Sequence, residues 1–360
     1  MTNGPAIVPG DIRTRAQIRP LFGGSPYGGI CPSKEMGTVI LYSDKEVAER
    51  LGYHDGWLAE EDALGPIFEY TGAGESGDQS FIGAGGAGNK AILQHAQKGR
   101  ILHVFVREGV VTGTATKTHR YIGEFALDED QPFVPRRSVG ANGKTRSTIV
   151  FRLRPTGGFE RSARDSIAPA PRTTSRFVPR AVTIEMLQAA AITRENFTAA
   201  DLRSATNIAA LSAAASGKLL PVRAMNVTEF PRSASVATTV RRRKALLIES
   251  YVEYLESQGH SVGSFEIRIE GKTTTLRTDL FDATDYVLYE AQGSSDRDAV
   301  RIALGRLLDY RRYVTHGARQ HEPKAVVLLP ETPDSDMITL LVNHHVSLIY
   351  QAHGEFVTTE

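Results

Sequence analysis

Cysteine is almost absent from this sequence of 360 residues, in which Cys31 is the only one. A single thiol excludes an internal disulfide framework. It also excludes zinc sites and deaminase sites that are built from paired cysteines. Any metal chemistry must therefore use carboxylates or histidines.

Long apolar runs are missing as well. No stretch approaches the roughly 18 consecutive apolar residues that read as a membrane span. The start of the sequence, MTNGPAIVPGDIRTRAQIRP, lacks the charged-then-apolar layout of a secretory signal. We therefore expect a cytoplasmic protein.

The sequence also lacks an excess of charge of one sign, since its formal net charge is +1. Local clusters remain, such as the acidic residues 60–62 and the basic run 241–244. The basic run has two interpretations, a solvated helix start or a contact to phosphate, and needs support from elsewhere in the chain.

The composition changes along the chain, and these changes predict a multidomain protein. Residues 1–155 are rich in glycine, aromatics and short strand-like runs, with one helical stretch at 89–99, and predict a compact, mostly β domain. Residues 156–181 are rich in Pro, Ser, Thr, Arg and Gly and predict a linker. An Ala-rich stretch predicts a helical connector over 182–240.

Residues 241–360 have a clearer order of elements. The periodicity predicts a helix at 242–258, three strands between 261 and 293, and a second helix at 296–313. A strand at 325–330, a helix at 336–345 and a strand at 346–351 follow. This order, αβββαβαβ, predicts an α/β domain with a mixed sheet flanked by helices.

Acidic residues cluster in the first hairpin of that domain. Asp279, Asp282 and Asp285 lie at the end of one strand and in its turn, and Glu290 lies in the next strand. Adjacent strands can bring such carboxylates to one edge, where they can hold Mg²⁺, which prefers oxygen ligands. The alternative is a turn that is acidic because aspartate suits turns.

The segment 241–356 resembles the PD-(D/E)XK nuclease superfamily. The resemblance rests on the element order and on the stretch TDLFDATDYVLYEAQGSSDRDAVRIALGRLLDYRR. It implies that Asp279 and Glu290 bind Mg²⁺ or Mn²⁺ and that Gln292 stands at the place of the usual catalytic lysine.

Gln292 is the departure from that pattern, because an amide is neutral and can only form hydrogen bonds. Either glutamine is a tolerated variant that positions water, or the site is inactive, naturally or by engineering. Arg306, Arg311 and Arg312 on the following helix face either phosphates or solvent. Glu249 and Glu253 could support the metal site, although a solvent-facing helix is the favoured interpretation of both.

Aromatic residues stand beside small polar residues and glycines in the first domain. Tyr53, Asp55 and Trp57 belong to GYHDGW, and Tyr70 and Thr71 belong to FEYTGAGESGDQ. Reading an extruded base requires flat faces for stacking, an acceptor for the exocyclic amine and glycines that allow close approach. The alternative is that these aromatics form the core near turns.

These two motifs, with Gly28-Gly29-Ile30, the helix that begins at 89–92 and RILHVFVRE, resemble the SRA (SET- and RING-associated) domain over residues 13–154. The likeness is to the readers of bacterial modification-dependent endonucleases. It implies a PUA-like barrel that flips a modified cytosine, with Tyr53, Tyr70, Trp57 and Thr71 forming the pocket and Asp55 accepting from the amine. Gly29 and Ile30 would contact DNA, and Asp78 and Gln79 would position loops.

Together the two resemblances predict a modification-dependent restriction endonuclease that binds double-stranded DNA carrying 5-methylcytosine or a related base. One metal site per chain favours a homodimer, because a duplex has two strands. A non-cleaving reader with a degenerate nuclease domain remains the alternative, supported by Gln292. A nicotinamide-dependent enzyme rests only on the glycine loop at 83–88, which no strand precedes.

Overall fold

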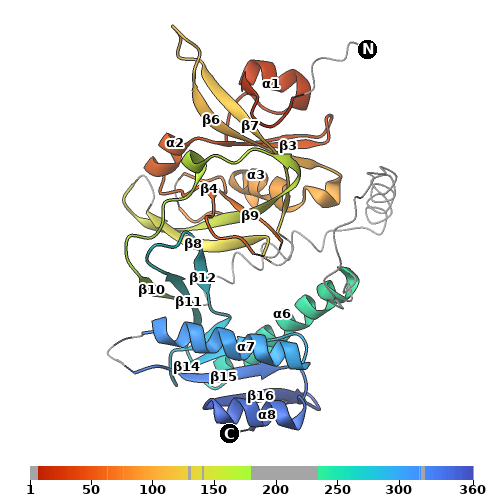
Figure 1. Cartoon of the computed structure of the whole chain (residues 1–360), viewed down its shortest axis with the longest axis vertical. Coiled ribbons are helices and arrows are strands. Elements are labelled where there is room, and N and C mark those ends of the chain that lie inside the picture. The colour runs from red at the N-terminus through yellow and green to blue at the C-terminus, as the bar shows by residue number, and fades with distance from the viewer. Residues whose placement is uncertain are drawn as a thin grey trace, which may run out of the picture. The chain divides into compact units, whose positions relative to one another are not determined.

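The computed structural model describes residues 7–179, apart from 63, 76, 129–130 and 140–141, and residues 234–359, apart from 316 and 318–320. The described residues form two compact units (Figure 1). Unit 1 ends at Ala168, and unit 2 contains the described residues from Pro169 onward. The Ala-rich segment 182–216, for which we predict helix, lies outside the described residues.

A mixed sheet of nine strands forms unit 1. Its strands run in the order β2-β3-β6-β7-β9-β5-β4, with β1 paired to β7 and β8 paired to β9. Only β3 and β6 pair in parallel among these described strands. The described pairings form a path from β2 to β4 that is not closed into a ring. The bounds are β1 (Ile12–Thr14), β2 (Ile30–Ser33), β3 (Thr38–Ser43), β4 (Gly56–Trp57), β5 (Phe68–Thr71), β6 (Ile101–Val110), β7 (Lys117–Leu127), β8 (Phe133–Val139) and β9 (Thr145–Phe159).

Three described α-helices belong to unit 1: α1 (Arg15–Phe22), α2 (Lys45–Arg50) and α3 (Gly83–Leu93). Thr14 and Gln17 form a capping box that starts α1. The helix predicted at 89–99 begins earlier, at Gly83, and continues as the short 3-10 helix η1 (Ala96–Lys98). Gly99, with φ 60°, ends η1 in the left-handed conformation that glycine adopts easily.

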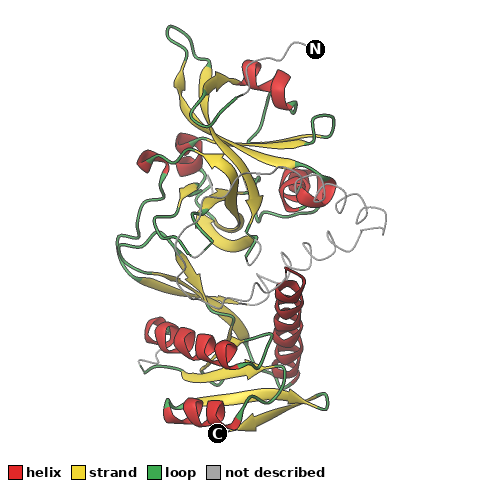
Figure 2. Ribbon diagram, turned by 45° about the vertical axis from the view of Figure 1, so that its right-hand side comes forward, coloured by secondary structure: helices red, strands yellow, loops and turns green. Residues whose placement is uncertain are grey.

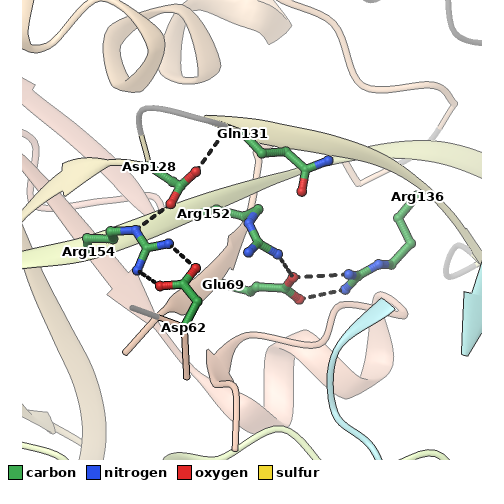
Figure 3. A network of polar contacts seen from close by, with 7 residues as sticks. All are labelled: Asp62, Glu69, Asp128, Gln131, Arg136, Arg152 and Arg154. Carbon is green, nitrogen blue, oxygen red and sulfur yellow. Dashed lines mark hydrogen bonds and ion pairs between the residues drawn. The ribbon is translucent and has the colours of Figure 1, made fainter. Parts of the chain in front are cut away.

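Ion pairs connect the strands around β5 (Figure 3). Glu69 of β5 is 1% exposed, and its two oxygens accept from Arg136 of β8 at 2.9 and 3.2 Å. Arg152 of β9 lies 3.7 Å from the same carboxylate. Arg154 of β9 binds Asp62 and Asp128 in the neighbouring part of the network. Since β5 also carries Tyr70 and Thr71, this network holds the strand from which part of the predicted pocket comes.

Unit 2 is built on a mixed sheet of eight strands in the order β10-β11-β13-β14-β15-β16-β17, with β12 paired to β11. The neighbours β14, β15 and β16 are parallel, and the other pairs are antiparallel. The strands are β10 (Thr174–Pro179), β11 (Val262–Arg268), β12 (Thr275–Arg277), β13 (Leu280–Asp282), β14 (Val287–Ala291), β15 (Lys324–Leu329), β16 (Val346–Ala352) and β17 (Glu355–Thr359). The predicted mixed sheet is therefore present, with the further strands β10 and β17 at its two ends.

Helices pack on both faces of this sheet (Figure 2). On one face, α6 (Ala234–Ser257) buries Leu247, Tyr251, Val252 and Leu255, whereas Leu246 is 55% exposed. On the other face, α7 (Arg297–Tyr310) and α8 (Ser335–Asn343) cover a second core. None of the helices in the described ranges is long and apolar enough to span a membrane.

The described part of the predicted linker, residues 156–179, contains regular secondary structure, and the division between the two units falls inside it, after Ala168. Strand β9 continues to Phe159, the 3-10 helix η2 follows at Ala163–Asp165, and β10 pairs with β11. The Phe177 ring of β10 lies 5.6 Å from Phe265 and 5.8 Å from Phe281. The polar and proline-containing composition reflects an edge strand, which needs few buried side chains and tolerates proline.

Phe177 therefore provides a test that β10 belongs to the core of unit 2. We expect Phe177→Ala to lower the free energy of unfolding of unit 2 by about 2–3 kcal/mol, because it leaves a cavity beside two aromatic rings. Hydrogen exchange of β11 in urea measures this. The matched control Thr174→Ala, an exposed position on the same strand, changes it by less than about 0.5 kcal/mol. Equal exchange in both variants would show that β10 does not stabilise the unit.

Candidate functional site

A cleft of about 520 Å³ opens in unit 1 between α1, α2 and the end of the sheet. Of the residues predicted to bind a base or DNA, Gly29, Tyr53 and Asp55 line it. Arg15, Lys117 and His119, which we did not predict, line it too. The cleft therefore combines two tyrosine rings, three carboxylates, two cationic groups and an imidazole; Tyr27, Asp44 and Glu75 supply the groups that were not predicted.

The Asp55 carboxylate is positioned by neutral donors. Its Oδ1 accepts from the backbone N–H of Thr71 at 2.8 Å, and its Oδ2 accepts from the Ser43 hydroxyl at 3.3 Å. Burial raises the pKa of Asp55 to about 6, although these hydrogen bonds oppose the rise. A carboxylate held in this way can accept a further hydrogen bond from a ligand in the cleft.

Tyr53 is connected to the glycine loop that follows β5. Its hydroxyl donates to the Gly74 carbonyl and accepts from the Gln79 amide at 3.1 Å. Gln79 is 3% exposed and also donates to the Gly72 carbonyl at 2.5 Å. The predicted positioning role of Gln79 thus has a geometric basis: one buried amide holds both the loop and the ring that lines the cleft.

Asn89 holds the same loop from α3. Its Oδ1 accepts from the Ala73 N–H at 2.7 Å, and its amide donates to the carbonyls of Ala73 and Ser80 at 3.1 and 2.9 Å. A Cβ on Gly72 would lie 2.6 Å from that Oδ1, so only glycine fits at this position. Asp78 accepts from the Ser147 N–H at 2.6 Å and joins the loop to β9. The motif YTGAG…GDQ…NKA is therefore one hydrogen-bonded assembly.

Other predicted pocket residues lie beneath the cleft, and their prediction as pocket walls needs correction. Trp57 is fully buried and Tyr70 is 3% exposed, both in the core of unit 1, and Thr71 is 4% exposed. The Tyr70 hydroxyl donates to the Gly29 carbonyl at 3.0 Å, so this residue supports the cleft wall from below. Ile30 packs against the same core. The sequence does not distinguish an aromatic residue that faces the core from one that faces the cleft, because both kinds stand next to glycines.

His119 is a cleft residue that sequence reasoning missed. Only 2% of it is exposed, and its Nδ1 has no hydrogen-bond partner within the part of the chain that the structure describes. Burial, helped by the charge of Arg15, lowers the pKa of His119 to about 4, so the ring is neutral near pH 7. A single histidine in a strand gave no signal for this placement.

The second candidate site lies in unit 2, where β13 meets β14. Asp279 directly precedes β13, and because Leu280 pairs with Tyr289, the next residue along β14, Glu290, lies beside Asp279. The Asp279 carboxylate accepts from the Ala291 N–H at 2.9 Å, which fixes it across the strand pair. Glu290 is 1% exposed. The structure therefore brings the two predicted metal-binding acids together.

Three nitrogen groups surround these acids. Lys244 Nζ lies 2.7 Å from Asp279 Oδ2 and 3.6 Å from Glu290 Oε1. Arg306 Nη1 lies 2.8 Å from Glu290 Oε1, and Gln292 Nε2 lies 3.5 Å from the same oxygen. The predicted residues Gln292 and Arg306 thus belong to this cluster. Lys244, from the basic run whose role the sequence left open, belongs to it too.

The acid pair has the chemistry of a divalent-cation site. Burial and the adjacent Asp279 raise the pKa of Glu290 to about 7, while Lys244 and Arg306 oppose the rise. A bound cation reduces the repulsion between two neighbouring carboxylates, and the Lys244 ammonium group already contacts both of them. Their oxygens are ligands that Mg²⁺ and Mn²⁺ accept.

The remaining predicted residues lie apart from the acid pair. Arg311 pairs with Glu322 at 3.1 Å, and Arg312, in the 3-10 helix η3 (Arg311–Tyr313), pairs with Asp309 at the end of α7. Glu249 and Glu253 are exposed on α6. No contact of these four residues with Asp279 or Glu290 is found among the described parts of the chain.

A second acidic cluster, at the other end of the hairpin, contains His260, Asp282 and Asp285, whose ligand atoms lie within 4.8 Å of one another. Both Asp282 oxygens are engaged: Oδ2 lies 2.6 Å from His260 Nδ1, and Oδ1 accepts from the Thr284 N–H at 2.8 Å. These contacts are those of an aspartate turn. The acidic-turn interpretation therefore suits Asp282 and Asp285, and it does not extend to Asp279.

Residues 9–168 match the family model of the ScoMcrA-like SRA domain. This part of the chain is an SRA domain, which confirms the resemblance predicted over 13–154. No curated protein matches the chain. A distinct α/β domain follows in unit 2, as predicted.

Several solved structures resemble the chain at low identity. The sulfur-binding and SRA domains of ScoMcrA with phosphorothioated DNA are 22% identical, with a TM-score of 0.30, over 42% of this chain and 40% of that one. The restriction endonuclease AspBHI is 15% identical, with a TM-score of 0.30, over 92% and 84%. MspJI with a 27-mer oligonucleotide is 12% identical, with a TM-score of 0.29, over 91% and 78%. The chain spans less than half the length of the ScoMcrA structures that it matches.

The raised pKa of Asp55 predicts a pH-dependent gain in stability on substitution. A folded-state pKa of about 6, above the ordinary 3.8, means that ionised Asp55 destabilises the fold as pH rises through this range. We expect Asp55→Asn, which keeps an acceptor for Thr71, to stabilise unit 1 by up to about 3 kcal/mol near pH 8. The gain disappears near pH 4. Urea unfolding at the two pH values measures it.

Asp44 is the matched control with the opposite sign. Burial raises its pKa, but Lys117 at 2.7 Å and the charge of Arg107 outweigh burial, and the pKa falls below its ordinary value. Asp44→Asn should therefore destabilise the unit above that ordinary pKa, with an effect that fades as pH falls below it. A pH-independent effect at Asp55 would contradict the burial of an ionisable carboxylate there.

Proposed function

We propose that this chain binds double-stranded DNA carrying a modified cytosine and hydrolyses a phosphodiester of that DNA with a divalent cation, as a modification-dependent restriction endonuclease. The observation that carries the proposal is the pairing, in one chain, of an SRA domain with an α/β domain in which Asp279, just before β13, lies beside the buried Glu290 of β14. The first selects the DNA and the second provides the chemistry.

The cleft residues suit an extruded cytosine. Asp55 accepts from the exocyclic amine, and the Tyr53 ring offers a face for stacking. Gly29 allows the backbone to approach the base edge, and Tyr70 holds that backbone in place. His119 is neutral near pH 7 and can form a hydrogen bond to a polar edge or substituent. The preferred modification is 5-methylcytosine or a related base.

In unit 2, Asp279 and Glu290 would hold Mg²⁺ or Mn²⁺. When bound, such an ion stabilises the charge of the phosphate and activates a water. Arg306, which is half exposed and contacts Glu290, is placed to meet a phosphate oxygen as well. This is the arrangement that the PD-(D/E)XK resemblance implies, with Gln292 beside the acids.

A homodimer is the assembly that suits this function. Each chain carries one pair of metal-binding acids, and cutting both strands of a duplex requires two such pairs. We therefore propose that two chains act on one modified site, each hydrolysing one strand.

A non-cleaving reader of modified DNA is the second candidate. The observation in its favour is Gln292, whose neutral amide occupies the position of a lysine in the PD-(D/E)XK pattern. In that case the SRA domain would bind modified DNA and unit 2 would serve as a scaffold.

Cleavage of methylated plasmid separates the candidates. We expect the chain with Mg²⁺ or Mn²⁺ to cut plasmid that contains 5-methylcytosine and to leave unmethylated plasmid intact. Asp279→Ala should lower the cleavage rate by at least about 100-fold because it removes a metal ligand, while methyl-dependent binding in a gel-shift assay is unchanged. Asp55→Ala should abolish the preference for methylated DNA.

Asp285→Ala is the matched control, since Asp285 is an exposed acid of the same hairpin that belongs to the turn. It should cut at the rate of the unchanged chain. Methyl-dependent binding without cutting would support the reader. Equal binding to both plasmids would exclude base selectivity.

A further inference from the structure

We propose that Lys244 of α6 supplies the positive charge that β14 lacks at Gln292, so that the nuclease site takes its lysine from a helix. The proposal rests on the proposed function and names a residue for it that the strand pattern alone would not provide.

The position of the ammonium group is the first observation. Lys244 Nζ contacts Asp279 Oδ2 at 2.7 Å and Glu290 Oε1 at 3.6 Å, and only 25% of the side chain is exposed. Its neighbour Arg243 is 55% exposed and reaches no closer than 4.0 Å to Glu331. A solvated basic run would leave both residues in water, so Lys244 is placed differently from Arg243.

Gln292 shows what the strand itself contributes. Its amide nitrogen lies 3.5 Å from the Glu290 oxygen that Lys244 and Arg306 also approach. An amide carries no charge and cannot offset negative charge on a phosphate. A lysine has a long, flexible stem, so its charge can reach the same oxygen from another element.

The close approach of α6 is the second, independent observation. A Cβ on Gly293 would lie 1.8 Å from the Val240 carbonyl oxygen and 3.0 Å from the Lys244 backbone nitrogen. Because both are backbone atoms of a helix, they cannot move aside to make room for a side chain at position 293. The absence of a side chain directly after Gln292 therefore lets the backbone of α6 between Val240 and Lys244 pass close to Gly293, which brings Lys244 to the acids.

The charge of Lys244 has two consequences that can be measured separately. It opposes the binding of a divalent cation by the same acids, because like charges repel. It also favours cleavage, because it offsets the negative charge that develops on the phosphate. A residue that merely held α6 in place would affect metal binding and cleavage in the same direction.

The test uses the full chain and the isosteric variant Lys244→Met, which keeps most of the stem. Calorimetric titration with Mn²⁺ should show affinity that is higher by roughly threefold to tenfold, since the repelling charge is gone. Cleavage of methylated plasmid should fall about 100-fold. Arg243→Met, its exposed neighbour, should change neither quantity by more than about twofold.

A second substitution moves the charge back to the strand. In Lys244→Met with Gln292→Lys, we expect cleavage to recover at least about tenfold and Mn²⁺ affinity to return toward that of the unchanged chain. Weaker Mn²⁺ binding in Lys244→Met, or no recovery in the double variant of a chain that does cut, would overturn the role of Lys244. An unchanged chain that never cuts, with tighter Mn²⁺ binding in Lys244→Met, would overturn the proposed function and support the placement of the charge.

Discussion

Burying a carboxylate away from water carries a large free-energy penalty unless other groups compensate it, and both candidate sites of this chain depend on that constraint. Glu69 shows the compensated case: both its oxygens accept from Arg136, and Arg152 lies close by. Asp55 receives hydrogen bonds from Thr71 and Ser43, which are neutral. Glu290 contacts Arg306 and Lys244, but burial and the adjacent Asp279 outweigh these two cations. The pKa of Asp55 and that of Glu290 are both raised, and such carboxylates concentrate at sites that bind ligands or ions. Glu69 stabilises the sheet, whereas Asp55 and Glu290 keep the capacity to bind.

Each site is assembled from segments that can approach because a side chain is missing. Gly72 leaves room for the Asn89 amide, and Gln79 then connects the same loop to Tyr53. Gly293 leaves room for the backbone of α6 and so for Lys244. In both units a glycine next to a strand end determines which helix contributes to the site. The chemistry of each site is therefore set by packing as much as by the residues that carry it.

Much of the fold could be predicted from the sequence because hydrophobic alternation is local. The strand TVILYS has the bounds of β3 (Thr38–Ser43), and α7 buries Ala299, Val300 and Ala303 as its periodicity predicts. The pairing of Asp279 with Glu290 could also be predicted, because the two strands of a hairpin place their residues side by side. Strand β10 was missed because an edge strand has the polar composition of a linker.

Contacts between distant segments could not be predicted in this way. Lys244 reaches the acids from a helix on the other face of the sheet, and nothing in a run of four basic residues distinguishes the one that turns inward. Trp57 and Tyr70 lie in the core and Tyr53 lies at the cleft, although all three stand next to similar motifs. His119 could not be predicted as a cleft residue, because its role depends on the position of β7 beside the cleft.

The most direct measurement is a crystal structure of the full chain bound to a duplex with a single 5-methylcytosine in the presence of Ca²⁺, which occupies oxygen sites. We expect the methylated base to leave the duplex, to lie against Tyr53 and to donate from its amine to Asp55. We also expect Ca²⁺ to be bound by Asp279 and Glu290. A methylated base that stays stacked in the duplex, or Ca²⁺ bound by Asp282 and Asp285, would contradict the proposed function.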